Sequence, residues 1–503
     1  MLRAFLYKGD EMKLWKNGFF HTMVNENEIK QQMATHKGKI IGFDEEINHL
    51  DFDEIIDLKG HHVYPGFVDA HLHLLGYGQK LSRLNLIQIK DQSLVIETLI
   101  HHFNDQPLFA EGYFECGITK KELNQISKDI PILLRHNDYH TITTNDAVLK
   151  LINQEHSNGV LTEELAEMAM NIFPKHTEHG LEEILKKSIK SLYHYGITGG
   201  HSDDLYYFNG FTQTLKVFDT VLEKMPFRAH LLLHHMVLDD FVHSRRMAFN
   251  QTPYLQLGAV KMFYDGTVYS KTALMKVPYR DSISNGMRIH SKSEFVEIIL
   301  KARKLGLTVA IHVIGDQGLI EVLELLKANP PKTGLYDRLI HTPWMDDQAI
   351  LMMKDMPITL DIQPQFLSSD LPWALDYFSI KPQYAFPWKT LLNNHIHLAG
   401  SSDAPVEIPN PLLGIYSAIK RQSDHNHQTY STHESLTRFE AIGLYTKGAN
   451  FSTMDNTRGY LKKGFIADFS IFIDDLLKTN LENLKNTLLY ETVINEHIVY
   501  KRT

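Results

Sequence analysis

Residues Tyr64–Gly78 read YPGFVDAHLHLLGYG and place two histidines, His71 and His73, one residue apart in an otherwise apolar run. Alternate residues of a strand point to the same side, so the two imidazoles project together while the apolar residues between them face the other way. A lone histidine on such a face is more often a satisfied core residue than a metal ligand. A pair at the end of a buried strand leaves both interpretations open, and the rest of the chain must decide between them.

The composition is that of a globular protein. Its 503 residues exceed what one simple core holds, so two or three domains are expected. Hydrophobic residues make up 43% of the chain and charged residues 22%, which is ordinary for a folded protein. The formal net charge of −9 provides no basic surface for nucleic acid or an anionic membrane.

The sequence also bears on compartment and partners. Its one cysteine, Cys116, cannot form an internal disulfide, which is typical of a reducing cytosol. The first residues, MLRAFLYKGDEMKLW, lack the apolar core of a signal peptide, and no run approaches the roughly eighteen apolar residues of a membrane span. We therefore expect a cytoplasmic protein with a small-molecule substrate and with no nucleic-acid or membrane partner; a homodimer is left open.

Short β-rich runs alternate with helical patterns between about residue 187 and residue 420. One helix, at 291–306, has clear boundaries, because Ser291 and Glu294 form a capping box and Gly306 follows its end. This alternation, with continuous apolar strands, indicates a parallel sheet covered by helices. The buried runs are FRAHLLLHHM (227–236), LQLGAVKMFYDG (255–266), LTVAIHVIGD (307–316), RLIHT (338–342), MPITLDIQPQF (356–366) and HIHLAGSSDAP (395–405).

Counting PGFVDAHLHL as the first strand and SLYHYGITGGHSD (191–203) as the second gives eight strands. Eight strands predict an α/β fold, a (β/α)8 TIM-type barrel over residues 64–454. A doubly wound sheet is the competing interpretation, but the glycine-rich phosphate turn of its nucleotide-binding version is missing. Residues from about 80 to 186 are too many for one crossover and are interpreted as an insertion between strands one and two. The β-rich ends, 1–63 plus 455–503, are expected to pair in a small composite β-sandwich.

Active sites in such barrels lie at the C-terminal ends of the strands. Neutral imidazoles and a carboxylate, which bind zinc and related divalent metals, occur at these ends together with one lysine. If these residues shared no function, six unrelated polar side chains would have to stand at the ends of buried runs by chance, so a metal site is favoured. The six residues are His71, His73, Lys261, His312, His341 and Asp403.

Lys261 has two interpretations. As an ammonium it is repelled by a metal and has no lone pair to donate, so it would extend to solvent or pair with Asp265. Alternatively, CO2 adds to the neutral amine and gives a carbamate whose two oxygens bridge two metals. The sequence alone leaves both interpretations open.

Seven segments stand out in chain order: PGFVDAHLHL, GAVKMFYDGT, HVIGDQG, RLIHT, DIQPQF, GSSDAPVEIPNPL and GFIADFSIF. Together they resemble the metal-dependent amidohydrolase superfamily, and specifically its branch related to N-substituted formamide deformylase. The resemblance covers nearly the whole chain, and the ordered set is specific although HxH alone is weak. It implies a (β/α)8 barrel with a composite β-sandwich and a binuclear, zinc-type centre.

The resemblance also implies roles for single residues. RHNDYH (135–140) is similar to the branch's substrate-side DGH element, with His140 in the histidine position. RLIH in place of RIEH and GGHSDD in place of SVHD are departures, and they bear on substrate specificity more than on the metal site. The implied cofactors are two divalent metal ions, zinc in type, bridged by a carboxylated Lys261. The other ligands are matched by His71, His73, His312, His341 and Asp403.

The expected function is hydrolysis of a C–N bond, in an amide, formamide or related small molecule other than a peptide, by a metal-activated hydroxide. Asp403 would bind one metal, accept the water's proton as general base and pass it to the leaving nitrogen. The candidates for binding substrate are His140, Asp265 and Gln363.

Two alternatives remain in view. One is a mononuclear-metal deaminase of the same fold, against which a bridging Lys261 argues. The other is a non-enzymatic, small-molecule-binding regulatory protein, against which the complete ligand set argues. The fold does not determine the substrate.

Overall fold

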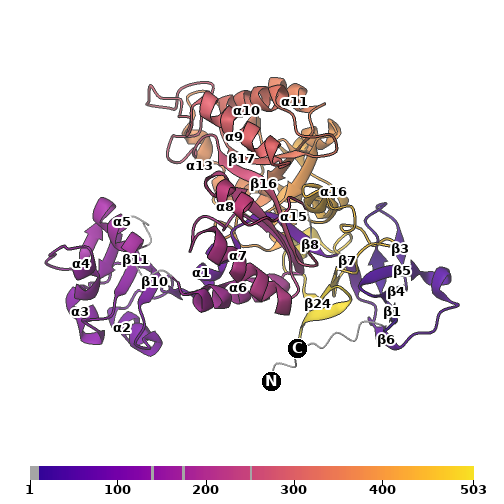
Figure 1. Ribbon diagram of the computed structural model, residues 1–503, viewed down its shortest axis with the longest axis horizontal. Coiled ribbons are helices and arrows are strands. Elements are labelled where there is room, and N and C mark those ends of the chain that lie inside the picture. Colours follow the sequence, from indigo (N-terminus) through magenta and orange to yellow (C-terminus); the bar gives the residue numbers. More distant parts are fainter. Residues whose placement is uncertain (1–10, 137–140, 173–175, 250–251) are drawn as a thin grey trace. The chain divides into compact units, whose positions relative to one another are not determined.

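The structure is a computed structural model that describes residues 11–136, 141–172, 176–249 and 252–503. The chain divides into two compact units, one formed by residues 78–187 and the other by the remainder of the chain. Figure 1 labels their helices and strands. Among the described helices, none is both long enough and apolar enough to cross a membrane.

Eight parallel strands form the central sheet of the larger unit, and they follow one another in the sheet in chain order. These are the eight runs expected from the sequence, so the prediction of an eight-stranded α/β barrel is confirmed, in a nearly closed form. The strands are β8 (Phe67–Leu72), β14 (Ile197–Ser202), β15 (Arg228–His234), β16 (Leu255–Phe263), β17 (Val309–Val313), β18 (Asp337–His341), β20 (Ile358–Ile362) and β22 (His397–Gly400).

The first and last strands of the sheet, β8 and β22, are not paired with each other, but the segments at their C-terminal ends meet at the mouth of the nearly closed barrel. Two backbone hydrogen bonds make the closure: Asp403 N–H donates to His71 O at 2.8 Å, and His73 N–H donates to Ala404 O at 2.7 Å. The buried carboxylate of Asp69 supports it, because it accepts the N–H of His71 at 3.2 Å and the hydroxyl of Ser402 at 2.6 Å. The residues that close the barrel are thus the residues at its mouth.

Helices follow the strands of the barrel. The helix expected at 291–306 begins with the predicted capping box of Ser291 and Glu294, and Gly306 follows it with a φ of +73°, which glycine adopts without strain. Phe295 and Ile299 are part of the buried face of this helix. The main helices are α7 (Phe211–Lys224), α9 (Lys292–Lys304), α10 (Asp316–Ala328), α11 (Asp347–Met353) and α15 (Pro411–Lys420).

The ends of the chain contribute to two further sheets, of which one joins strands from both ends and the other contains strands from the N-terminal end alone. The six-stranded sheet joins β2 (Phe19–His21), β3 (Ile29–Lys30) and β7 (His62–Pro65) to β23 (Phe469–Phe472), β24 (Leu489–Ile494) and β25 (His497–Lys501). The four-stranded sheet contains β1 (Lys13–Lys16), β4 (Met33–His36), β5 (Lys39–Phe43) and β6 (Glu54–Asp57).

The two ends of the chain meet in the six-stranded sheet, where β7 pairs antiparallel with β23 and Val63 lies opposite Ile471. One buried core contains side chains from both sheets, among them Trp15, Phe20 and Phe469. Burial of these apolar side chains stabilises both ends together. A composite β-sandwich as a domain of its own stays a prediction.

Residues 78–187 carry a sheet of their own, in a range close to the insertion expected at about 80–186. The strand order is β13 (Val160–Thr162), β12 (Thr141–Thr144), β11 (Ile132–His136), β10 (Leu108–Tyr113) and β9 (Leu84–Asn85). Helices α2 (Gln92–His102), α3 (Lys120–Ile126), α4 (Asp146–Leu151) and α5 (Glu163–Ile172) belong to the same unit.

Candidate metal centre

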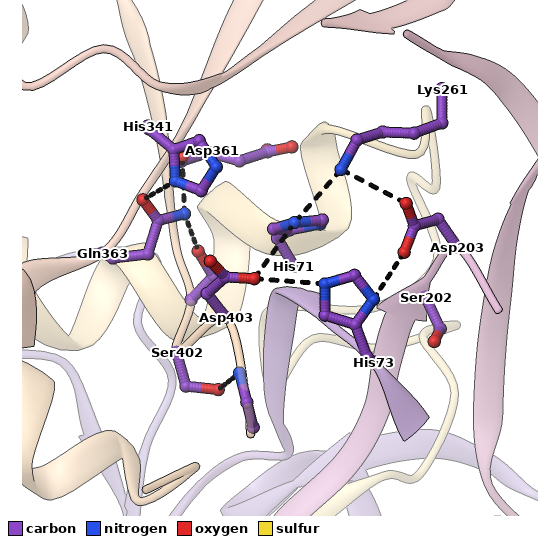
Figure 2. A network of polar contacts seen from close by, with 12 residues as sticks. His71, His73, Ser202, Asp203, Lys261, His341, Asp361, Gln363, Ser402 and Asp403 are labelled. Atoms are coloured by element: carbon purple, nitrogen blue, oxygen red, sulfur yellow. Dashed lines mark hydrogen bonds and ion pairs between the residues drawn. The ribbon is translucent and has the colours of Figure 1, made fainter. Parts of the chain in front are cut away.

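The six side chains expected at the mouth come from five strand ends of the barrel. Figure 2 shows five of them converging on one place, with dashed contacts between them. Two lie at the end of β8, one on each of β16, β17 and β18, and one after β22. In this order they are His71, His73, Lys261, His312, His341 and Asp403.

His71, His73 and Asp403 form the tightest group. One ligand-capable atom from each lies within 4.8 Å of the other two. Asp403 Oδ1 is 3.4 Å from His71 Nε2 and 3.3 Å from His73 Nε2. Two imidazole nitrogens and a carboxylate oxygen at such spacing fit a divalent ion such as zinc.

His312 and His341 lie beside this group. Their ring centroids are 4.6 Å apart, and the His341 ring lies 5.8 Å from that of His71. His341 Nδ1 contacts Gln363 Oε1 at 2.8 Å, and Gln363 Nε2 donates to Ser401 Oγ at 2.9 Å. The contact assigns the His341 proton to Nδ1, which leaves the lone pair of Nε2 for a metal. Gln363 therefore positions His341, and its predicted contact with substrate stays a prediction.

Lys261 is buried in the middle of the group, with 1% of its side chain exposed. Its Nζ lies 3.4 Å from His71 Nε2 and 3.3 Å from Asp203 Oδ2. The partner of this ammonium is therefore Asp203, not Asp265 as considered from the sequence. Carboxylation of Lys261 stays a prediction.

Asp203 is a residue of this site that the sequence analysis missed. It follows the end of β14 at Ser202, and its Oδ1 lies 2.7 Å from His73 Nδ1. The rule applied to the other strands, that polar residues at the C-terminal end face the mouth, also selects Asp203. The histidine of the same segment, His201, is buried elsewhere, with Nδ1 3.2 Å from Arg338 Nη2.

Burial keeps three of the imidazoles neutral. It lowers the pKa of His71 and His312 well below the ordinary histidine value, and the positive charge of Lys261 acts in the same direction. Burial also lowers the pKa of His341. Neutral imidazoles carry a lone pair, so these three side chains can bind a metal at pH 7.

His73 and the two carboxylates, Asp203 and Asp403, have pKa values shifted so that their charged forms are favoured. Burial acts to lower the pKa of His73, but Asp203 and Asp403 outweigh it and raise this pKa well above the ordinary value. Burial acts to raise the pKa of Asp203 and of Asp403, yet the cations beside them, His73 and Lys261 among them, lower both. Two carboxylates are thus balanced by an imidazolium and an ammonium.

Two residues of the site have a left-handed backbone. The φ angles are 79° at His341 and 55° at Asp403, and neither residue is a glycine. Such conformations cost on the order of 1–3 kcal/mol each and cluster at functional sites. The bond from Asp403 N–H to His71 O and that from Thr342 N–H to Val313 O, at 3.0 Å, hold the two positions.

Asp265 holds loops together. Its carboxylate accepts the N–H groups of Leu274 at 2.8 Å, Ile314 at 3.0 Å and Gly315 at 2.8 Å. The side chain is fully buried, so these contacts fix the segments that follow β16 and β17. His140 lies outside the described residues. A role of either residue in substrate binding stays a prediction.

A pocket of about 280 Å³ lies at the barrel mouth, lined by residues that follow β16, β17, β18, β20 and β22. His341 forms part of its wall, and Phe366 stacks on that ring with centroids 6.0 Å apart. Burial raises the pKa of Asp370 to about 7, and the charge of Glu407 adds to the shift. The aromatic and acidic lining residues are Tyr269, Trp344, Phe366, Asp370, Trp373 and Glu407.

A parallel (β/α)8 barrel with imidazoles and carboxylates at its C-terminal mouth defines a class of barrel proteins whose chemistry sits on the strand ends. Comparison with known families makes the assignment: the chain belongs to the amidohydrolase family, whose profile matches residues 54–500. The resemblance to metal-dependent amidohydrolases noted in the sequence is therefore confirmed.

Individual relatives agree with this assignment. The chain is 34% identical to YtcJ of Bacillus subtilis (strain 168), a protein whose name assigns it to the amidohydrolases, over 97% of this chain and 99% of that one. It is 22% identical to N-substituted formamide deformylase of Arthrobacter pascens, over 90% of each chain. The crystal structure of an uncharacterized metal-dependent hydrolase from Pyrococcus horikoshii OT3 superposes with a TM-score of 0.82 at 26% identity, covering 94% of this chain and 99% of that one.

Replacing Asp203 tests its ion pair with Lys261. In metal-free protein, Asp203→Asn leaves a buried ammonium uncompensated, so the free energy of unfolding should fall by about 3–5 kcal/mol, measured by urea denaturation. Asp203→Asn combined with Lys261→Met should recover part of that loss. The matched control is Asp219→Asn, which breaks a half-exposed pair with Arg246 and should cost about 0–1 kcal/mol. An Asp203→Asn effect no larger than the control's would contradict the pairing.

Proposed function

We propose that the protein is a metal-dependent hydrolase of a C–N bond, in an amide, formamide or related small molecule. The observation that carries this proposal is the convergence of His71, His73 and Asp403 within 4.8 Å of one another at the mouth of an amidohydrolase-family barrel. Similarity to N-substituted formamide deformylase, at 22% identity, favours a small amide over a peptide.

Two divalent ions, zinc in type, fit the donors at the mouth. His71, His73 and Asp403 would hold one ion, and His312 and His341 the other. When bound, such ions polarise a carbonyl and lower the pKa of water from about 16 toward 7. The resemblance noted in the sequence implies that Lys261 would be carboxylated and would also bind these ions.

The ion pair of Lys261 with Asp203 opposes this carboxylation. It stabilises the ammonium form, whereas a carbamate at the same place would be a second negative charge beside Asp203. Two divalent cations would compensate the negative charges of the carbamate and of Asp203, whereas a single divalent cation would compensate them less completely. The ion pair is therefore the observation that favours a second candidate, a mononuclear-metal deaminase in which Lys261 stays an ammonium.

In this proposal Asp403 carries the proton of the reaction. Its pKa is lowered, because neighbouring cations outweigh burial, so its carboxylate is ionised and can accept a proton from the attacking water. Water oxygen adds to the carbonyl carbon, the C–N bond breaks, and Asp403 returns the proton to the leaving nitrogen. Its backbone bond to His71 O holds the carboxylate beside His71 and His73.

The pocket beside His341 suits one part of such a substrate. Its aromatic side chains favour an apolar or aromatic group, and Asp370 and Glu407 favour a positive charge at the end of that group. We therefore assign to the substrate a protonated amine separated from the scissile amide by a ring or a short alkyl chain.

Asp403→Asn tests the chemical assignment. An amide cannot accept the water's proton, so the hydrolysis rate should fall by a factor on the order of a hundred or more while the fold is kept. Elemental analysis of wild-type protein prepared without chelator should find at least two zinc equivalents per chain. Asp355→Asn, at an exposed position before β20, is the control and should hydrolyse at the wild-type rate. Near wild-type activity in Asp403→Asn, or full activity with well under one metal per chain, would contradict the proposal.

A pair of isosteric formamides tests the pocket. The N-formyl derivative of a benzylamine that carries a para-aminomethyl group should show a kcat/KM about tenfold above that of the para-hydroxymethyl analogue, since one ion pair desolvated on binding supplies about that factor. Asp370→Asn should remove this preference without lowering the rate on the neutral analogue. Asp376→Asn, on an exposed residue of α13 (Trp373–Asp376), should keep it. Equal rates on both compounds in the wild type would overturn the assignment of charge.

A further inference from the structure

A second group of metal-ligating side chains lies outside the barrel. His21 ends β2, His62 begins β7, and Asp475 follows β23, so both ends of the chain contribute to it. One ligand-capable atom from each lies within 4.8 Å of the other two. The chemistry proposed at the barrel mouth uses none of these residues.

The distances within this group suit a shared ion. His21 Nε2 lies 3.0 Å from His62 Nδ1 and 3.7 Å from Asp475 Oδ1, and His62 Nδ1 lies 3.9 Å from Asp475 Oδ2. Ligand atoms around a tetrahedral zinc ion, with bonds of about 2.0–2.1 Å, are ~3.3 Å apart. The observed separations lie on both sides of that value, so small rotations bring all three atoms onto one ion.

The side chains are held in this arrangement by their neighbours. The Tyr64 hydroxyl donates to Asp475 Oδ1 at 2.8 Å, and Leu477 N–H donates to the same oxygen at 2.9 Å, which turns Oδ2 toward His62. The His21 ring stacks on Tyr64 with centroids 4.4 Å apart and planes 4° apart. Hydrogen-bonded carboxylates and fixed rings are the usual surroundings of metal ligands.

Burial and charge agree with this geometry. The exposed fraction of the side chain is 2% for His21, 17% for His62 and 12% for Asp475. Burial lowers the pKa of His21 to about 4 and also lowers that of His62, so both rings are neutral and keep a lone pair. Lys478 Nζ lies 3.8 Å from Asp475 Oδ2, but this lysine is 76% exposed and can extend into solvent.

A hydrogen bond between the histidines explains only part of the arrangement. It accounts for the 3.0 Å contact between the two rings. It does not explain why the Asp475 carboxylate faces the same two nitrogens. Oδ1 lies 3.7 Å from His21 Nε2 and Oδ2 lies 3.9 Å from His62 Nδ1, and both distances are too long for a hydrogen bond.

We propose that His21, His62 and Asp475 bind one divalent transition-metal ion, zinc in class, which clips the N-terminal strands to the C-terminal loop. Two imidazole nitrogens favour zinc, cobalt or nickel over magnesium or calcium, which prefer oxygen. Only the folded chain brings the three residues together, so the ion stabilises the fold. This site is structural and independent of the hydrolytic function.

Metal stoichiometry tests the proposal. After saturation with zinc and gel filtration, His62→Gln should hold one equivalent less than the wild type by elemental analysis, with unchanged hydrolytic activity. The matched control is His61→Gln, at the neighbouring position, whose ring packs instead on Tyr490 with centroids 4.2 Å apart. It should hold the wild-type amount. Added zinc should raise the Tm of wild type and His61→Gln by more than it raises that of His62→Gln. Equal stoichiometry and equal Tm shifts in all three proteins would overturn the proposal.

A second measurement needs no substitution. Anomalous diffraction at the zinc edge, on wild-type crystals grown with zinc, should show a peak between His21 Nε2, His62 Nδ1 and Asp475. Absence of that peak in crystals whose barrel mouth is loaded with zinc would also overturn the proposal. Loss of the barrel metals with retention of this peak would instead count against the proposed function alone.

Discussion

The hydrogen bond from Asp403 N–H to His71 O is the contact on which the site depends, because it closes the barrel between the ends of its first and eighth strands. It joins two candidate metal ligands that are more than 300 residues apart in the chain. Asp69 reinforces the same junction through His71 N–H and the Ser402 hydroxyl. Since the closure and the site share these residues, the barrel cannot open at this seam without separating the ligand atoms.

Charge balance is the second constraint on the mouth of the barrel. Asp203 and Asp403 are ionised there although they are buried, and they are compensated by His73 and Lys261. A site with two buried carboxylates has to hold positive charge in any working state. Divalent metal ions would provide that charge, and they would release His73 and Lys261 from their ion pairs. This physical argument connects the arrangement of side chains to the metal dependence of the family.

Much of the barrel can be read from the sequence, because each strand is a continuous apolar run and its last residues face the mouth. The helix at 291–306 can also be predicted from the sequence, because its capping box and terminal glycine are signals within the segment itself. Asp203 was missed because GGHSDD offers a histidine and two acids, and the segment by itself does not show which of the three faces the mouth. The partners of Asp265 are backbone groups near residues 274 and 314, which no local pattern reveals. The meeting of His62 with Asp475 likewise requires the pairing of β7 with β23, across about 400 residues of sequence.

The most direct test of the central claim is a crystal structure of the active, zinc-loaded protein with anomalous data at the zinc edge. The account predicts two peaks at the barrel mouth, about 3.5–4 Å apart, one among His71, His73 and Asp403 and the other beside His312 and His341. It also predicts a planar three-atom group beyond Lys261 Nζ that spans the two ions, with the ion pair to Asp203 broken. A single peak, or an unmodified Lys261 amine still paired with Asp203 in protein that hydrolyses amides, would contradict the binuclear account.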